Sequence, residues 1–159
     1  MIRTAVAAAA SALALTCVPS AAWADHFFGG PSDDTFHGTP RSDVMRGLAG
    51  DDDLFGAGGD DYTYGGGGGD RLSGEGGFDE AHGGTGNDRI FGGPGRDDLF
   101  DGLGLDVVNG GSGNDYIGME GDSRPDRVRC GAGRDTVAYD AHVDEADVPI
   151  GCERVWVFD

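Results

Sequence analysis

The sequence contains no lysine. Its 11 basic residues are all arginine, and they stand against 29 aspartate and glutamate residues, which gives the 159-residue chain a formal net charge of -18. This balance argues against nucleic acid and anionic membranes as partners, because both are bound by basic surfaces. It favours cations instead.

Apolar residues are also scarce, whereas glycine supplies 32 residues. A chain this rich in glycine and acidic groups lacks the apolar content for an ordinary core, so without a stabilising ligand we expect it to be largely disordered. At this length one domain is expected.

The one long apolar run extends from Ala5 to Val18, which is too short and too rich in alanine for a good membrane span. Arg3 precedes it, Pro19 ends it, and Ala22-Trp23-Ala24 has the small-x-small pattern of a cleavage site. These features predict a secretory signal peptide over 1–24 and a secreted, extracellular protein that begins at Asp25. The alternatives are an uncleaved anchor or a lipoprotein modified at Cys17, although no lipobox precedes that cysteine.

Cysteine is nearly absent, with three residues in all. Cys17 would leave with the signal peptide, and an even pair, Cys130 and Cys152, would remain in a compartment that permits disulfides. We expect these two to be bonded; the alternative is two free thiols.

A repeat of nine residues runs without a gap from Gly29 to Gly118, in ten units. Position 1 is glycine in nine units, with Asp101 as the exception, and position 4 is glycine in eight, with Ser32 and Arg41 as the exceptions. Position 8 is mostly large and apolar. Position 6 is aspartate in every unit: Asp34, Asp43, Asp52, Asp61, Asp70, Asp79, Asp88, Asp97, Asp106 and Asp115.

Each repeat position has a physical reason. The glycines allow positive φ and sharp turns, and such turns expose carbonyl oxygens that, together with an aspartate, suit Ca²⁺, which takes six to eight oxygen ligands. Positions 7 to 9 form a short strand, and the position 8 side chain points inward. Two units make one coil, so each turn stacks on the turn 18 residues later, with an ion between them.

Two units carry a clear resemblance: residues 83–91, Gly-Gly-Thr-Gly-Asn-Asp-Arg-Ile-Phe, and residues 110–118, Gly-Gly-Ser-Gly-Asn-Asp-Tyr-Ile-Gly. They are similar to the hemolysin-type, or RTX, calcium-binding repeat GGxGxDxUx. The resemblance implies an all-β fold, a parallel β-roll (a right-handed β-solenoid), with the position 6 aspartates as calcium ligands. Stacking the ten units gives four pairs of turns on each side, and the first pair on each side includes a turn without the position 4 glycine, so we expect about six to eight Ca²⁺ ions. Many family members carry a C-terminal secretion signal; this chain has an N-terminal one, so toxin biology is not carried over.

After Gly118 the repeat slips by two residues, Met119 and Glu120. Degenerate units follow, with Cys130 at position 1 and with Asp126 and Asp135 at position 6. Both could add calcium sites, and we expect Asp135, whose turn contains Gly133, to be a calcium ligand. This segment, 119–159, is similar to the tail of secreted actinobacterial calcium-binding proteins. A solenoid end needs covering, and we expect residues 155–158, Val-Trp-Val-Phe, to cover it as a C-terminal cap stapled by the disulfide. Arginines cluster here too, as an anionic-ligand site or, on the simpler interpretation, as partners for nearby carboxylates: Arg124, Arg127, Arg129 and Arg134.

Other chemistry fits poorly. His37 and His82 fall in an odd and an even unit, hence on different sides of the roll, which argues against zinc. No serine lies in a nucleophile elbow, Gly65 to Gly69 lacks a phosphate-loop lysine, and carboxylates with a strict nine-residue period are not a glycosidase pair. About 40 residues outside the signal peptide and repeats are too few for a catalytic domain, so we expect no enzyme.

Three functions therefore compete. The first is a calcium-binding structural or interaction module that folds outside the cell. The second is an accessory module of an extracellular hydrolase or epimerase, and the third is a binder of ice or of a polysaccharide or cell-surface partner. Ice binding would favour a regular outward Thr/Asn ladder, which positions 3 and 5 lack.

Overall fold

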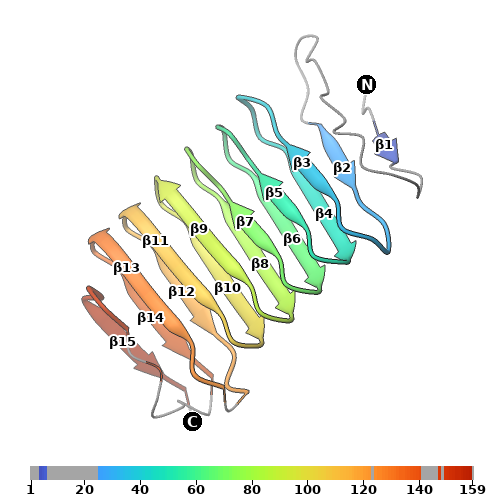
Figure 1. The fold of residues 1–159 in the computed structure, drawn as a ribbon. Helices are drawn as coiled ribbons and strands as arrows, with labels where there is room; N and C mark the ends of the chain where they lie inside the picture. Colours follow the sequence, from blue (N-terminus) through green and yellow to red (C-terminus); the bar gives the residue numbers. More distant parts are fainter. Residues whose placement is uncertain (1–3, 7–24, 123, 141–146, 148, 159) are drawn as a thin grey trace.

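In a computed structural model of the chain, residues 4–6, 25–122, 124–140, 147 and 149–158 are described. The described residues form a parallel β-solenoid, with coils stacked along one axis (Figure 1). No helix long and apolar enough to cross a membrane occurs among these residues. The predicted all-β parallel architecture is confirmed.

Two parallel sheets make the walls of the solenoid, because each coil contributes one strand to each wall (Figure 1). The nine-stranded sheet consists, in spatial order, of β1 (Thr4–Val6), β2 (His26–Phe28), β4 (Val44–Ala49), β6 (Tyr62–Gly67), β8 (Glu80–Thr85), β10 (Asp98–Leu103), β12 (Tyr116–Met119), β14 (Thr136–Tyr139) and β15 (Arg154–Val157). The six-stranded sheet consists of β3 (Thr35–His37), β5 (Asp53–Phe55), β7 (Arg71–Ser73), β9 (Arg89–Pro94), β11 (Val107–Gly113) and β13 (Arg127–Gly133).

The register of the strands follows the repeat. Tyr62 lies beside Glu80, and Glu80 beside Asp98, so each coil takes 18 residues. At the phase slip the spacing widens: Tyr116 pairs with Thr136, a step of 20 residues. The two inserted residues are absorbed in one coil, and the periodicity continues beyond them.

The core is a narrow double row of position 8 side chains. All ten are buried, including the weaker apolar positions Thr63 and Ala81, and Val128 and Val137 continue the rows through the degenerate units. Parallel pairing brings each side chain onto its counterpart one coil away, as with Leu54 on Leu72. Because this apolar core is thin, the polar turns on either side make up much of the interior of the solenoid.

The N-terminal end begins earlier than the glycine pattern indicates. Asp25 and the buried Phe27 occupy positions 6 and 8 of a partial unit, and β2 pairs with β4. β1 pairs with β2 and lies within the predicted signal peptide. Cleavage after Ala24 stays a prediction; it would leave β2 as the edge strand.

The C-terminal end is closed by β15, which pairs with β14, and by a disulfide between Cys130 and Cys152, whose Cα atoms lie 5.1 Å apart. The predicted disulfide is confirmed. The cap differs from expectation in how it covers the end: residues 155–158 satisfy the strand edge by hydrogen bonding, but their side chains are 51–53% exposed. The reason is that no described coil lies outside β15 to bury them.

Candidate calcium sites in the turns

Backbone conformation separates the roles of the repeat glycines. Positive φ occurs at positions 2 and 4, for example at Gly84 (φ 111°) and Gly86 (φ 133°), where glycine is favoured because it has no Cβ. Position 2 tolerates exceptions, since Leu48, Ala57 and Glu75 adopt positive φ there. Position 1 glycines lie outside this region and are required for another reason.

Position 1 is glycine because oxygen atoms converge there. A Cβ built on Gly83 would lie 2.6 Å from Oδ2 of Asp88, in the same unit, and still closer to the carbonyl oxygen of Asp101, one coil later. The same pair of contacts, both under 3.0 Å, recurs at Gly29, Gly38, Gly47, Gly56, Gly65, Gly92 and Gly110. We call this space between a position 6 Oδ2 and the next coil's position 1 carbonyl the inter-coil site.

The two oxygens of each position 6 aspartate have different surroundings. Oδ1 accepts a hydrogen bond from the backbone N–H of the aspartate one coil earlier, as in Asp70 N to Asp88 Oδ1 at 2.7 Å and Asp79 N to Asp97 Oδ1 at 3.0 Å. This ladder fixes every carboxylate in the same orientation. Oδ2 then faces the inter-coil site.

In the middle of the solenoid Oδ2 is buried and has no hydrogen-bond partner among the described residues. This holds for nine position 6 aspartates: Asp52, Asp61, Asp70, Asp79, Asp88, Asp97, Asp106, Asp115 and Asp135. A buried anionic oxygen without a donor is costly, and here it faces a carbonyl, which is also an acceptor. The arrangement fits a hard cation with oxygen ligands.

The first two predicted ligands are surrounded differently. Oδ2 of Asp34 accepts a hydrogen bond from the N–H of Gly30 at 2.7 Å. Oδ2 of Asp43 accepts two, from the N–H of Thr39 at 2.6 Å and from its hydroxyl at 3.0 Å. These are the units that lack the position 4 glycine, and their carboxylates are satisfied by the protein itself.

Burial shifts the ionisation of the free carboxylates. Desolvation, only partly offset by the backbone hydrogen bond and reinforced in most cases by neighbouring aspartates, raises the pKa of Asp52, Asp61 and Asp97 to about 7. The same causes raise the pKa of Asp88 and Asp106 to about 6. Without a cation these groups resist ionisation, so a divalent ion is the natural neutraliser near pH 7.

The carboxylate rows extend past the predicted set. Asp25 N donates to Asp43 Oδ1, Asp126 Oδ1 accepts from Asp106 N, and Asp126 N in turn donates to Asp147 Oδ1. Glu153 continues the other row by accepting from Asp135 N at 2.7 Å. Sequence reasoning missed Asp25, Asp147 and Glu153; the spacing of 18 residues from Asp135 to Glu153 was the available signal.

Asp101, the exception at position 1, was also missed as a site residue. It is fully buried, and desolvation raises its pKa to about 8, although hydrogen bonds from Glu120 and Gly102 lower it.

The histidines discussed above lie apart from these turns and stack on rings: His37 on Phe55 in one sheet, and His82 on Tyr64 and Phe100 in the other.

Comparison with known proteins supports this description. No curated protein and no solved structure matches the chain. A family model does match, that of the RTX calcium-binding nonapeptide repeat (4 copies), over residues 25–63, 64–99 and 91–117. The match covers more than half of the chain and the whole regular part of the solenoid, and the chain belongs to the RTX calcium-binding nonapeptide repeat family.

Proposed function

We propose that this chain is a secreted calcium-binding protein that folds when it meets extracellular Ca²⁺ and then acts as a structural or interaction module. The observation that carries the proposal is the row of buried Oδ2 atoms on each side of the solenoid that have no hydrogen-bond partner among the described residues. For Asp52, Asp61, Asp70, Asp88, Asp97 and Asp115 a carbonyl oxygen of the next coil converges on the same space, so folding without a cation would bury many uncompensated charges.

We assign the ions to the intervals between successive coils. The regular units with a free Oδ2 provide six intervals, three between Asp52 and Asp106 and three between Asp61 and Asp115. The intervals from Asp106 to Asp126 and from Asp115 to Asp135 would bring the total to about eight ions. The intervals that start at Asp34 and Asp43 are left out, because their Oδ2 atoms already accept hydrogen bonds.

Metal binding supplies much of the folding free energy in this proposal, since a site split between two coils does not exist in the unfolded chain. Extracellular calcium modules bind at roughly 10⁻⁴–10⁻³ M, so the chain would stay unfolded at intracellular calcium levels. The test is circular dichroism of the chain from Asp25 during a calcium titration. A β signal that rises cooperatively and is lost in chelator is expected; a full β signal in excess chelator contradicts the proposal.

Secretion has its own test. The pattern at Ala22 and Ala24 predicts that protein recovered from the culture medium begins at Asp25. N-terminal sequencing that finds Met1 in exported protein would contradict cleavage, without bearing on calcium binding.

A second candidate function, binding of a polysaccharide, is favoured by the outer face of the nine-stranded sheet. The rings of Tyr64, His82 and Phe100 stack on one another at centroid distances of 4.7 and 4.5 Å. The stack stops at Gly118, beside a pocket of about 550 Å³ lined by Phe100, Tyr116 and Phe158, among others. A pocket with apolar walls and a few polar groups is a plausible ligand site.

Glycan-array binding by the calcium-loaded chain tests this candidate. Binding that disappears with Phe100→Ala but persists with Phe78→Ala, a change at an exposed ring outside the pocket lining, would support it. Binding that is indifferent to Phe100, or that occurs equally in chelator, would contradict it.

A further inference from the structure

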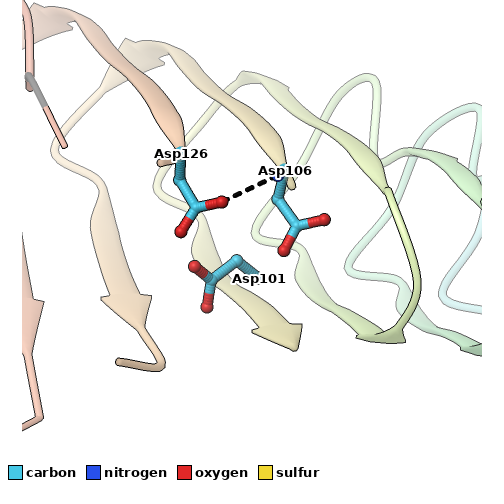
Figure 2. A group of neighbouring side chains, drawn as sticks. All are labelled: Asp101, Asp106 and Asp126. Atoms are coloured by element: carbon cyan, nitrogen blue, oxygen red, sulfur yellow. Dashed lines mark hydrogen bonds between the residues drawn. The ribbon is translucent and has the colours of Figure 1, made fainter. Parts of the chain in front are cut away.

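One inter-coil site differs from all others in the part of the chain that the structure describes. Three aspartates, Asp101, Asp106 and Asp126, place carboxylate oxygens within 4.8 Å of one another, and all three residues are buried (Figure 2). Asp106 and Asp126 are successive members of one position 6 row. Asp101 comes from β10 and occupies position 1, where the other regular units have glycine.

The two-residue insertion explains how Asp101 fits. In a regular unit the position 1 Cβ would clash with the carbonyl one coil later, as at Gly83. Beyond the pair Phe100 and Gly118, β12 no longer follows β10, because Met119 and Glu120 widen the coil. The space left is taken by the Asp101 side chain, whose Oδ1 accepts hydrogen bonds from Gly102 N at 2.6 Å and Glu120 N at 2.8 Å.

Two further oxygens of the cluster lack a donor in the described part of the chain. Oδ2 of Asp101 and Oδ2 of Asp106 are both buried without a hydrogen-bond partner among the described residues, and Asp101 has no exposed surface. Arg124, whose charge acts to lower the pKa of Asp106, is exposed. Hydrogen bonds thus hold Asp101 in place with its carboxylate beside those of Asp106 and Asp126 (Figure 2).

We propose that Asp101, Asp106 and Asp126 form a three-carboxylate calcium site that binds Ca²⁺ more tightly than the repeat sites do. A regular interval offers two position 6 carboxylates; this one adds a third, and calcium affinity rises with the number of charged ligands and the rigidity of the site. The assignment rests on the proposed calcium-binding function and extends it: the irregular coil carries the first ion to bind. A metal at this site explains why a buried aspartate stands where the repeat requires glycine.

The test is calcium binding measured by competition with a chelating dye, on the chain from Asp25 with its disulfide intact. In the wild type, one ion per chain should bind at a free calcium concentration about tenfold or more below that of the remaining ions. Asp101→Asn keeps an oxygen to accept the bonds from Gly102 and Glu120 but removes the charge. It should abolish this first phase while the later ions still bind and circular dichroism at saturating calcium stays unchanged.

Two variants serve as controls. Asp88→Asn weakens the regular sites and should leave the first phase in place, and Asp122→Asn removes a nearby charge outside the cluster and should also leave it. Wild-type chain that binds all ions with one affinity, or an Asp101→Asn chain that retains the tight phase, overturns the proposal. Wild-type chain that binds no calcium would instead refute the proposed function, so the two failures are distinguishable.

Discussion

The first coil and the middle coils of the solenoid contribute strands to the same two sheets and aspartates to the same rows. They differ in what surrounds the carboxylates of those aspartates. Asp34 and Asp43 receive donors from their own turns, through Gly30 and Thr39. From Asp52 onward the second oxygen of each regular aspartate lacks a donor within the described part of the chain. The inter-coil contacts occur in both regions, so the comparison teaches that the difference lies in the local donor. Dependence on calcium should therefore be concentrated in the middle, where the described turns supply none.

Lowering the pH should reduce the calcium dependence of the middle coils more than any substitution, because protons can neutralise many of their carboxylates at once. In the metal-free folded chain the pKa of Asp52 is raised to about 7 and that of Asp101 to about 8, against about 3.9 in an unfolded chain. The folded state therefore binds more protons, and this stabilisation is fully present below about pH 4 and lost as pH rises through 6 to 8.

In chelator, the β signal in circular dichroism should accordingly grow as the pH falls from 8 to 5, above the isoelectric point of 4.2. When calcium is present, a lower pH should instead disfavour folding. It should raise the calcium concentration at the folding midpoint, because protons compete with calcium for the same oxygens. A metal-free chain that is more folded at pH 8 than at pH 5 would contradict the account.

A methyl group inside one middle site should have the next largest effect. Gly83→Ala places a Cβ against Oδ2 of Asp88 and the carbonyl oxygen of Asp101, so it should block that ion and cost about 3 kcal/mol or more of folding free energy. Gly30→Ala is the matched control, because its Cβ meets only Oδ2 of Asp34, at 3.9 Å. Calcium-dependent thermal unfolding measures both; equal effects would show that the inter-coil site is not where the ion binds.

Single aspartate substitutions sharpen the comparison between coils. Asp88→Asn removes a ligand from the middle of a row, where it borders two sites, whereas Asp34 borders an interval without a free Oδ2. We expect the calcium midpoint to rise about tenfold for Asp88→Asn and to change little for Asp34→Asn, because Oδ2 of Asp34 already accepts a hydrogen bond from Gly30. Equal shifts in a calcium titration followed by circular dichroism would remove the distinction between the two regions.

The disulfide should have a smaller effect on calcium binding than these substitutions, and a general effect on stability. Replacing Cys130 and Cys152 by alanine opens a link between residues 22 apart and should cost roughly 3 kcal/mol on the chain-entropy estimate. Because Cys130 lies in the degenerate region, the loss should appear in denaturant unfolding, with the number of ions in the middle coils unchanged. Loss of those ions would mean that the end of the solenoid controls the middle.

Much of the regular region was predictable because one short pattern determines it. The nine-residue spacing predicts the strands, the inward direction of the position 8 side chains and the coil of 18 residues, because each follows from stacking identical units. The difference between the two oxygens of Asp88 was not predictable, because it depends on a backbone N–H one coil away.

The irregular ends were harder to predict, because their features depend on contacts between coils and not on the repeat pattern. Glu153 replaces an aspartate, and Asp101 is accommodated by an insertion that follows it by 18 residues, so neither shows in the repeat itself. The exposed side chains at 155–158 could not be foreseen, because apolar residues at an open edge look like a core until the next coil is found to be missing from the described chain.

The most direct test of the account is the number of calcium ions bound per folded chain, measured by equilibrium dialysis on the chain from Asp25. The free Oδ2 atoms predict about eight ions in the wild type, the same number in Asp34→Asn, and fewer in Asp88→Asn. One or two ions per chain, or an equal loss in both variants, would contradict the claim that unsatisfied aspartate oxygens between coils are what calcium binds.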